Sequence, residues 1–364
     1  MPHFSPEPTF RHGQPPRTAI LFVNLGTPDE PTAPAVRRYL AEFLSDRRVV
    51  EIPPLLWKII LHGIILRTRP RASAAKYQKV WMPEGSPLAV WTRKQAEMLG
   101  AWLGEAGHQV LVRHGMRYGN PSVASQLDAL KAEGATRILI LPAYPQYSGT
   151  TTGSVADAVF AWGERQRNLP ELRFVQRYHD DPGYIAALAA RVEAYWREHG
   201  KGEKLVFSFH GVPARTLELG DPYHCECHKT ARLLASELGL RADEVMTTFQ
   251  SRFGRAKWLE PYTQPTLEAM AKSGIRRVDV MCPGFSSDCL ETLEEINMEV
   301  REAFLHNGGE AFHYIPALND SQRWIAALAG IAQQHMGGWP TRQAADPRAL
   351  SASAERARAM GAPR

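Results

Sequence analysis

Cysteine is scarce in this chain, with four residues in 364. Small secreted domains depend on many paired cysteines, so this number excludes a disulfide framework of that kind. Residues 1–17 contain several prolines and no apolar stretch that resembles the core of a signal peptide. Together these absences predict a protein of a reducing, cytoplasmic compartment.

No apolar run is long enough to cross a bilayer. The most apolar window, residues 52–66 (IPPLLWKIILHGIIL), is shorter than the roughly 20 residues of a transmembrane helix. It also contains Lys58 and His62. Such a window can still dip into a membrane or line an apolar opening. We therefore expect peripheral membrane contact through 52–66, at the inner face of the membrane.

The motifs that hold nucleotide phosphates are also missing. No Gly-x-Gly-x-x-Gly follows a predicted strand and no Gly-Lys-Ser/Thr loop is present, which disfavours a nicotinamide or ATP site. The formal net charge is +5, from 43 Lys and Arg against 38 Asp and Glu, and the basic residues are dispersed. This mild basic bias does not indicate a nucleic-acid partner.

Short β-rich runs alternate with amphipathic helical patterns along most of the chain. This alternation is typical of βαβ units, so the predicted fold class is α/β, with doubly wound, Rossmann-like parallel sheets. A chain of 364 residues is too long for one ordinary core and suits two such domains. The predicted strands begin at Thr18, His108, Thr136, Leu172, Lys204, Glu244 and Arg276.

The strands divide into two similar halves that we expect to face one cleft. Residues 17–162 are predicted to form the N-terminal domain and 163–319 the C-terminal domain, whose sheet begins with the run at 172–178. A helix at 320–336 is predicted to pack back on the first domain. Residues 337–364 are rich in Ala, Arg, Pro and Ser without an apolar period, which predicts a loose tail.

Unusual side chains follow the predicted strands. Ligands of open α/β sheets bind beyond the carboxyl ends of the strands, so these positions indicate the ligand. Aromatic, Arg and His residues gather there without a phosphate loop, which suits a flat apolar molecule with acidic edges, such as a porphyrin. The segments are 25–28, 116–118, 144–153, 210–213, 250–254 and 282–288.

His210 ends one of these strands and precedes Gly211 and Pro213. At such a rim, an imidazole can accept a proton or coordinate a metal near neutral pH. A hydrogen-bonded structural histidine is an equally good interpretation of a histidine at a strand end. Local sequence leaves both roles open.

A predicted helix after residue 288 carries carboxylates at three- and four-residue steps. An α-helix would place them on one face, opposite an apolar face. The ladder begins beside the rim that holds His210, so it could pass a divalent cation or protons. A capping box followed by a solvated charged face explains the same spacing. The acids are Asp288, Glu291, Glu295, Glu299 and Glu302, and the apolar side carries Leu293, Ile296, Val300 and Phe304.

Cys225 and Cys227 lie in a short His-Cys-Glu-Cys-His run at 224–228. One Cys-x-Cys without a second pair is incomplete for a structural zinc site, so metal binding there stays open. Cys282 and Cys289 are predicted to be packed thiols.

The chain also carries a series of longer motifs: NLGTP (24–28), GSP (85–87), YPQYSGTTTG (144–153), FSFHGVP (207–213), GDPY (220–223), FQSRFG (249–254), WLEP (258–261) and CPGFSSDCLETLEE (282–295). In order and spacing, these motifs resemble the signature of the ferrochelatase family. The resemblance covers about residues 18–336, and the last block is highly specific. It implies a chelatase-like fold and the insertion of Fe²⁺ into protoporphyrin IX, the terminal step of haem biosynthesis.

The resemblance also implies roles for single residues. His210 and Glu291 match the family's catalytic pair, which binds the metal and handles the pyrrole protons. Glu295 and Asp288 match an acidic relay on the same helix. Fe²⁺ and protoporphyrin IX are then substrates, with no tightly bound cofactor. The positions that match the porphyrin pocket are Leu25, Tyr77, Ser86, Arg117, Tyr118, Trp258 and Phe285.

Two departures from the family pattern refine this expectation. Members with a [2Fe-2S] cluster use a cysteine in the 144–153 loop and three in a C-terminal extension, whereas this chain has Gly149 and a tail without cysteine. Such a cluster is not expected here. Members that prefer coproporphyrin carry Tyr at the position of Leu25, which favours protoporphyrin as the substrate.

Two alternatives to this function stay open from the sequence. A non-catalytic haem or porphyrin carrier would need the pocket but not the carboxylates. A related cobalt or nickel tetrapyrrole chelatase would need a more basic pocket than the aromatic rim suggests. Whether the chain forms a homodimer is also left open.

Overall fold

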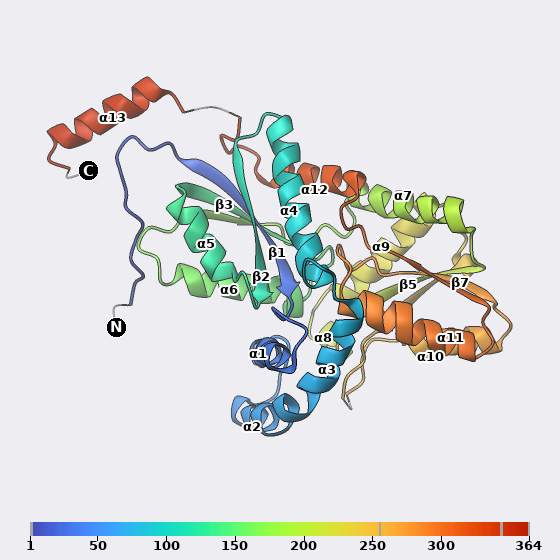
Figure 1. The fold of residues 1–364 in the computed structure, drawn as a ribbon. Coiled ribbons are helices and arrows are strands. Elements are labelled where there is room, and N and C mark those ends of the chain that lie inside the picture. Colours follow the sequence, from blue (N-terminus) through green and yellow to red (C-terminus); the bar gives the residue numbers. More distant parts are fainter. Residues whose placement is uncertain (1–2, 255, 343–344, 363–364) are drawn as a thin grey trace.

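The computed structural model describes residues 3–254, 256–342 and 345–362. Within these ranges the strands form two parallel four-stranded sheets (Figure 1). The orders are β2-β1-β3-β4 and β6-β5-β7-β8, so each half winds outward in both directions from its first strand. Doubly wound sheets bind ligands at that switch point. The strands are β1 (Arg17–Gly26), β2 (Val110–Tyr118), β3 (Ala135–Pro142), β4 (Glu171–Phe174), β5 (Lys204–His210), β6 (Val245–Gln250), β7 (Arg277–Met281) and β8 (Ala311–Ile315).

Strand β1 is buried on both faces, which explains its continuous apolar sequence. Ala19, Leu21 and Val23 pack against helices α5 and α6 on one face. Ile20 and Phe22 belong to the core on the opposite face, beneath α4. Alternate side chains of a strand point to opposite faces, so one run of apolar residues serves two layers. These helices are α4 (Pro87–Glu105), α5 (Val123–Ala132) and α6 (Ser154–Gly163).

Strand β4 lies in the first sheet, where it pairs with β3 in parallel. The prediction that the run at 172–178 opens the second sheet is therefore wrong. The boundary predicted at residue 163 falls inside the β3–α6–β4 unit. Strand β4 has only four residues and no distinctive apolar pattern. Its neighbour in the sheet is set by the position at which the chain leaves α6, and local sequence does not encode that position.

The second sheet is also covered on both faces. Val206, Val278 and Val280 pack with the residues of helices on one side, including Ile296 and Phe304. The alternate residues of β5 pack against helices on the other side. Helices η4 (Glu291–Val300), α10 (Thr263–Lys272) and α11 (Arg301–His306) form the first layer, and α7 (Pro182–His199) and α9 (Tyr223–Glu237) form the second.

Helix α12 (Gln322–His335) packs against both halves and not only against the first. It lies beside α4 and α7 (Figure 1). Its Trp324 is fully buried, with ring centroids 5.9 Å from Tyr178 and 5.9 Å from Tyr184. One continuous core therefore joins the two sheets. A shared core fixes the position of one strand rim relative to the other.

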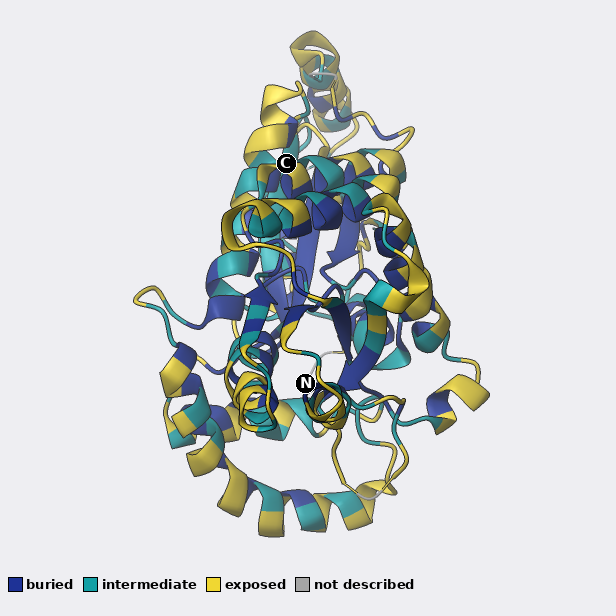
Figure 2. Cartoon of the chain, turned by 90° about the vertical axis from the view of Figure 1, so that its right-hand side faces the viewer, coloured by how far each residue is buried: buried dark blue, intermediate teal, exposed yellow. Residues whose placement is uncertain are grey.

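Residues 52–66, which we call the lip, project from the first half. Helices α2 (Pro54–Ile60) and η1 (Leu61–Ile65) build it, between α1 (Ala33–Phe43) and α3 (Leu66–Val80). Helix α2 exposes Leu55 at 83% and Ile59 at 72%. Figure 2 shows many exposed residues along the helices at the bottom of the view. None of the helices in the described ranges combines the length and apolar character that a bilayer crossing requires.

The expected loose tail contains helix α13 (Pro347–Ala359), which corrects that expectation for this segment. Asp346 caps the helix by accepting a hydrogen bond from the Arg348 amide at 2.9 Å, and Pro347 occupies a favourable first position. Alanine-rich sequence then propagates the helix without an apolar stripe. The remaining short elements are η2 (Gly149–Gly153), α8 (Arg215–Glu218) and η3 (Ala242–Glu244).

Candidate active site

The carboxylate helix η4 is a π-helix and not the predicted α-helix. Because π-helical hydrogen bonds join residues five apart, its side chains fan out differently. Glu294 and Glu299 both reach Lys76, at 2.9 and 2.7 Å, whereas Glu295 faces the end of β6. The predicted single ladder is therefore divided between two surfaces. Wide π turns are frequent at functional sites.

Glu295 occupies the rim of the second sheet. Its Oε1 accepts the Ser251 amide at 2.7 Å, and its Oε2 accepts the Ser251 hydroxyl. Burial raises the pKa of Glu295, and the negative charge of Glu291 raises it further. The Ser251 hydrogen bonds and the charge of His210 oppose this shift without cancelling it. A carboxyl group with a raised pKa is suited to holding and passing a proton.

His210 ends β5 with its imidazole half-buried at the same rim. Its Nδ1 lies 2.7 Å from the carbonyl oxygen of Gly211. A carbonyl can only accept, so Nδ1 carries the proton of this hydrogen bond. In the neutral ring, Nε2 then holds the free lone pair that a proton or a metal requires.

His210 and Glu291 are brought together by Gln250. The backbone of Gln250 is the parallel partner of His210, and its side-chain Nε2 donates to the backbone carbonyl of Glu291 at 3.0 Å. The charges of both His210 and Glu291 act on the pKa of Glu295. The end of β5, the end of β6 and the start of η4 therefore meet at one rim, and these elements carry His210, Glu291 and Glu295.

A hollow opens beside Glu291 between the two halves. Its lining includes Leu25, Tyr77 and Ser86, and its volume is about 10 Å³. A cavity of this size holds about one water molecule, so in this structure it has no room for a whole macrocycle. Ser86 also caps α4 by accepting the Ala89 amide at 3.2 Å.

Two predicted aromatic residues lie next to His210. The Phe285 ring centroid is 6.5 Å from the imidazole centroid. Trp258 lies against Gly211, where an added Cβ would come within 3.2 Å of the indole and 2.7 Å of the Gln250 carbonyl oxygen. Only glycine allows this close approach. Both aromatic residues are partly exposed, so they can present surface to a ligand.

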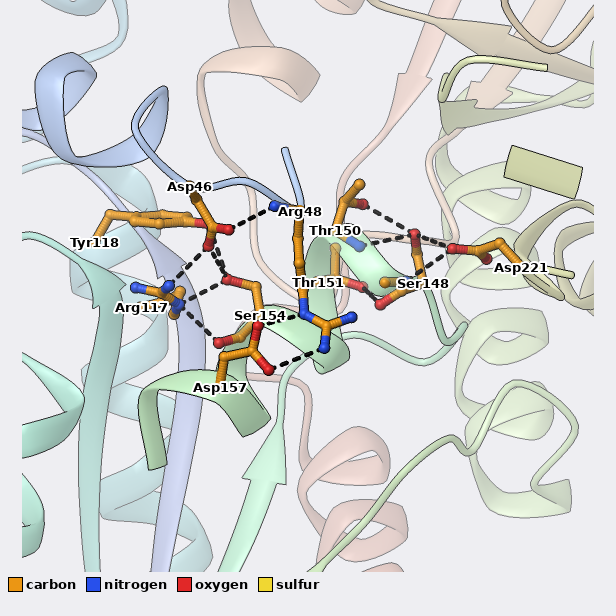
Figure 3. A network of polar contacts seen from close by, with 11 residues as sticks. Asp46, Arg48, Arg117, Tyr118, Ser148, Thr150, Thr151, Ser154, Asp157 and Asp221 are labelled. Atoms are coloured by element: carbon orange, nitrogen blue, oxygen red, sulfur yellow. Dashed lines mark hydrogen bonds and ion pairs between the residues drawn. The ribbon is translucent and has the colours of Figure 1, made fainter. Parts of the chain in front are cut away.

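Arg117 and Tyr118 lie in a hydrogen-bond network centred on Asp46 (Figure 3). The Asp46 carboxylate accepts Arg117 at 2.7 Å, Tyr118 at 2.8 Å and the Ser154 hydroxyl. The Tyr118 ring is fully buried and packs edge-on against Phe43. It offers no face to a porphyrin, so the expected place of Tyr118 in the lining of the porphyrin pocket is not supported. Asp46 was not identified from the sequence, because nothing in its neighbourhood indicates contacts more than 70 residues away.

Asp288 is buried and its carboxylate is fully engaged. It accepts hydrogen bonds from Asn319 at 2.7 Å, from Thr292 at 2.9 Å and from the Tyr314 hydroxyl. These contacts fasten the start of η4 to the loop after β8. The expected place of Asp288 in an acidic relay is therefore not supported. The capping box is not formed either, because the Asp288 amide donates to Asn319 Oδ1 at 2.9 Å and the start of η4 has no side-chain cap.

We expect Asp46→Asn to destabilise the fold by about 2–4 kcal/mol, because breaking a buried ion pair leaves its partner without charge compensation. The side chains of Arg117 and Asp46 are only 18% and 8% exposed. Asp157→Asn is the matched control, since the Arg48–Asp157 pair is 40% and 48% exposed and should contribute under about 1 kcal/mol. Urea denaturation of both variants gives the comparison, and equal losses would contradict the assignment.

The Asp46 network also predicts a pH dependence. Burial alone would raise the pKa of Asp46, but hydrogen bonds from Ser154, the Arg48 amide and Tyr118, with the Arg117 charge, lower it overall. A lowered pKa in the folded state adds stability above the unfolded-state value of about 3.9. This contribution is lost as the pH falls through the folded-state pKa. The difference between wild type and Asp46→Asn should therefore shrink in strongly acidic urea titrations.

Comparison with known proteins identifies the family. A family model described as ferrochelatase matches residues 17–336. The chain belongs to the ferrochelatase family. Ferrochelatases of Polaromonas sp. and Methylibium petroleiphilum are 68% identical to it, over 99% and 98% of this chain and 100% and 99% of their own lengths. The ferrochelatase of Dechloromonas aromatica is 57% identical over 100% of both chains.

Solved structures show the same architecture. The chain resembles SirB of Bacillus subtilis with Fe³⁺, with a TM-score of 0.52 and 13% identity over 88% of this chain and 96% of that chain. The cobalt complex of the sirohydrochlorin chelatase SirB gives a TM-score of 0.51 at 12% identity, over 88% of this chain and 97% of that chain. The predicted α/β, chelatase-like fold is confirmed. The predicted function is confirmed by the family: the chain is a ferrochelatase enzyme of haem biosynthesis with Fe²⁺ as a substrate.

Proposed function

We propose that His210, Glu291 and Glu295 form the centre where Fe²⁺ enters protoporphyrin IX. The meeting of β5, β6 and η4 at Glu295 supports this proposal, because these elements carry the imidazole and the two carboxylates, and the charges of His210 and Glu291 both act on Glu295. Imidazole nitrogen and carboxylate oxygen are both ligands that divalent iron accepts. Aromatic surface from Trp258 and Phe285 lies beside them, where a flat ring can rest.

The reaction replaces two pyrrole N–H protons with Fe²⁺, so two protons leave for each iron inserted. In our proposal, Nε2 of His210 faces the macrocycle and accepts a proton. Glu291 supplies negative charge for the incoming cation. Glu295, whose pKa is raised by burial, takes up protons that leave the centre. Asp288 has no part in this path, because Asn319 and Thr292 already occupy its carboxylate.

One edge of the porphyrin is proposed to lie against the residues that line the hollow beside Glu291. Leu25 gives this hollow an apolar wall, while Tyr77 and Ser86 give it hydroxyl groups. Arg117 acts from behind this surface, since Asp46 and Ser154 already bind its guanidinium. We therefore propose that Arg117 and Tyr118 position the residues around them and do not stack on the porphyrin.

The test of this proposal is anaerobic turnover. Enzyme at a substoichiometric concentration is mixed with Fe²⁺ and protoporphyrin IX, and conversion of the free-base spectrum to that of haem is followed. We expect many turnovers per chain. Conversion or binding that stops at one equivalent would instead indicate a porphyrin carrier.

Protoporphyrin IX is expected to exceed coproporphyrin III in kcat/KM by about tenfold or more. Coproporphyrin carries two additional propionates, and an apolar wall such as Leu25 leaves a buried carboxylate without a partner. Steady-state rates with both porphyrins measure the ratio. Leu25→Tyr should reduce it, and a ratio near one in the wild type would contradict this substrate assignment.

We also propose that the lip contacts the membrane surface. Leu55 and Ile59 are 83% and 72% exposed and lie on neighbouring positions of one helical face. Burying such side chains stabilises binding by about 1.5–3 kcal/mol each. An interfacial helix of this kind lies in the plane of the headgroups rather than spanning the bilayer.

Leu55→Glu/Ile59→Glu should lower the fraction of protein that sediments with vesicles by more than about tenfold, since it removes this apolar contact. Vesicles of 30% phosphatidylglycerol and 70% phosphatidylcholine are a suitable probe. Leu219→Glu is the control, because Leu219 is 74% exposed but lies outside the lip. An equal loss for the control, or none for the double variant, would refute the lip as the contact.

We propose that the enzyme works without a resident [2Fe-2S] cluster. A Cβ at Gly149 would meet Asp221 Oδ2 at 3.5 Å and Arg48 at 3.8 Å, and the Gly149 amide donates to the same Asp221 oxygen at 2.8 Å. A Cβ would fit at these distances, so the proposal is supported by composition: the loop has glycine at position 149, and residues 337–364 contain no cysteine. Sulfide analysis of the purified protein tests the proposal, which one sulfide pair per chain would overturn.

A further inference from the structure

Helix α9 divides the His-Cys-Glu-Cys-His run into two groups that face opposite ways. Glu226 and Cys227 are buried. Glu226 accepts the Tyr147 amide at 2.7 Å and pairs with Arg177, so it joins α9 to the loop after β3. His224 and His228 instead lie on the outer side, and His228 is exposed. The metal cluster considered from the sequence is therefore not formed by all of its members.

His224 and His228 lie one helical turn apart with their rings side by side. Four residues turn an α-helix by about 40° beyond one full turn, so the two side chains share a face. Their ring centroids are 4.4 Å apart with an interplanar angle of 56°. The His224 ring also stacks on Phe249, with centroids 5.8 Å apart and planes 18° apart, which restricts its rotation.

This spacing is close to that of two imidazole ligands of one metal ion. With a metal–nitrogen bond of about 2.1 Å and a ring centroid about 1.1 Å behind the nitrogen, two imidazoles on one metal have centroids about 4.5–5.2 Å apart, for bond angles of about 90–109°. The observed separation of 4.4 Å lies just below that range, and a small rotation of the exposed His228 ring would bring the pair into it.

We infer that His224 and His228 bind a borderline divalent metal ion, such as Zn²⁺ or Co²⁺, on the outer face of α9. Neutral imidazole is a preferred ligand of these ions. No group of three His, Cys, Asp or Glu side chains converges on one point in the described residues, so water completes the coordination. The site is open and exchangeable rather than a closed structural zinc site.

The inferred site is separate from the insertion centre. His224 packs on Phe249, whereas the next residue, Gln250, binds Glu291 and Glu295. Adjacent side chains of a strand point to opposite faces, so the sheet lies between the histidine pair and η4. A metal on α9 would therefore be held in addition to the substrate metal, and its loss should leave porphyrin turnover unchanged.

The experiment is equilibrium dialysis of the full chain, without a histidine tag, against Co²⁺ and separately against Zn²⁺ at pH 7.5. We expect the wild type to bind one equivalent more than His224→Gln/His228→Gln. His228→Gln alone should weaken this site by more than about 100-fold, because even partners outside the coordination sphere account for about 10–100-fold. His228 is exposed, so this single variant should fold normally, which circular dichroism and turnover of protoporphyrin IX verify.

Two further variants separate geometry from composition. His228→Gln/Arg232→His keeps two outward histidines but places them about 12 Å apart along the helix, so it should fail to restore the site. Cys225→Ser should retain the extra equivalent, since the inferred ligands are the two imidazoles. The inference is overturned if the double glutamine variant binds as much metal as the wild type. It is also overturned if His228→Gln/Arg232→His binds the extra equivalent of metal, or if Cys225→Ser alone abolishes that binding.

Discussion

His210→Ala is expected to lower the rate of Fe²⁺ insertion by about 10²- to 10⁴-fold, the usual contribution of a positioned acid–base group. The substitution removes the Nε2 lone pair at the rim while the strand that carries it stays paired with Gln250 on β6. Loss of rate should thus occur with little loss of stability. Initial rates of haem formation and a urea denaturation curve, measured on the same preparation, check both parts.

His306→Ala is the matched control for this prediction. His306 is an exposed histidine in the last turn of α11, away from the rim of β5, so its loss should change the rate by less than about twofold. Zn²⁺ insertion should follow the same pattern as Fe²⁺ insertion, because both ions accept imidazole and carboxylate ligands. A near-normal rate for His210→Ala would remove the imidazole from the proposed centre.

Strands with strong internal patterns could be predicted from the sequence. The runs that became β1 and β5 are continuous and apolar because helices cover both faces of each sheet. β4 was assigned to the wrong sheet because four residues do not specify a lateral partner. The same limit applies to α12, whose apolar surface packs on α4 and α7 together. Pairing between distant elements depends on the whole chain, whereas periodicity is local.

The candidate site shows a similar division. His210 and Glu291 stand in distinctive motifs, so the sequence could point to them. Asp46 acts through contacts more than 70 positions away, and its own neighbourhood carries no such signal. Gln250 and Ser251 lie in the motif at 249–254, but that motif does not reveal their contacts with Glu291 and Glu295, which are more than 40 positions away. The predicted row of carboxylates also assumed an α-helix after residue 288. The helix is instead a π-helix, and its wider turns direct Glu299 toward Lys76 and away from the rim.

Glu291→Gln is expected to lower the rate of insertion by about 10²- to 10⁴-fold as well, because it removes the charge that attracts the cation while keeping the size of the side chain. Its backbone carbonyl still accepts Gln250, so η4 should keep its place. Glu299→Gln is the matched control on the same helix. Its carboxylate is 46% exposed and bound to Lys76, and its loss should change the rate by less than about twofold.

The strongest check of the Glu291 assignment is the pKa of its neighbour. The negative charge of Glu291 raises the pKa of Glu295, so Glu291→Gln should lower that pKa, whereas His210→Ala should raise it by removing a positive charge. Titration of the Glu295 carboxyl carbon by NMR measures both shifts without requiring turnover. Opposite shifts require that all three groups share one cleft. If neither variant moves this pKa, the proposed centre is wrong, whatever the two rates show.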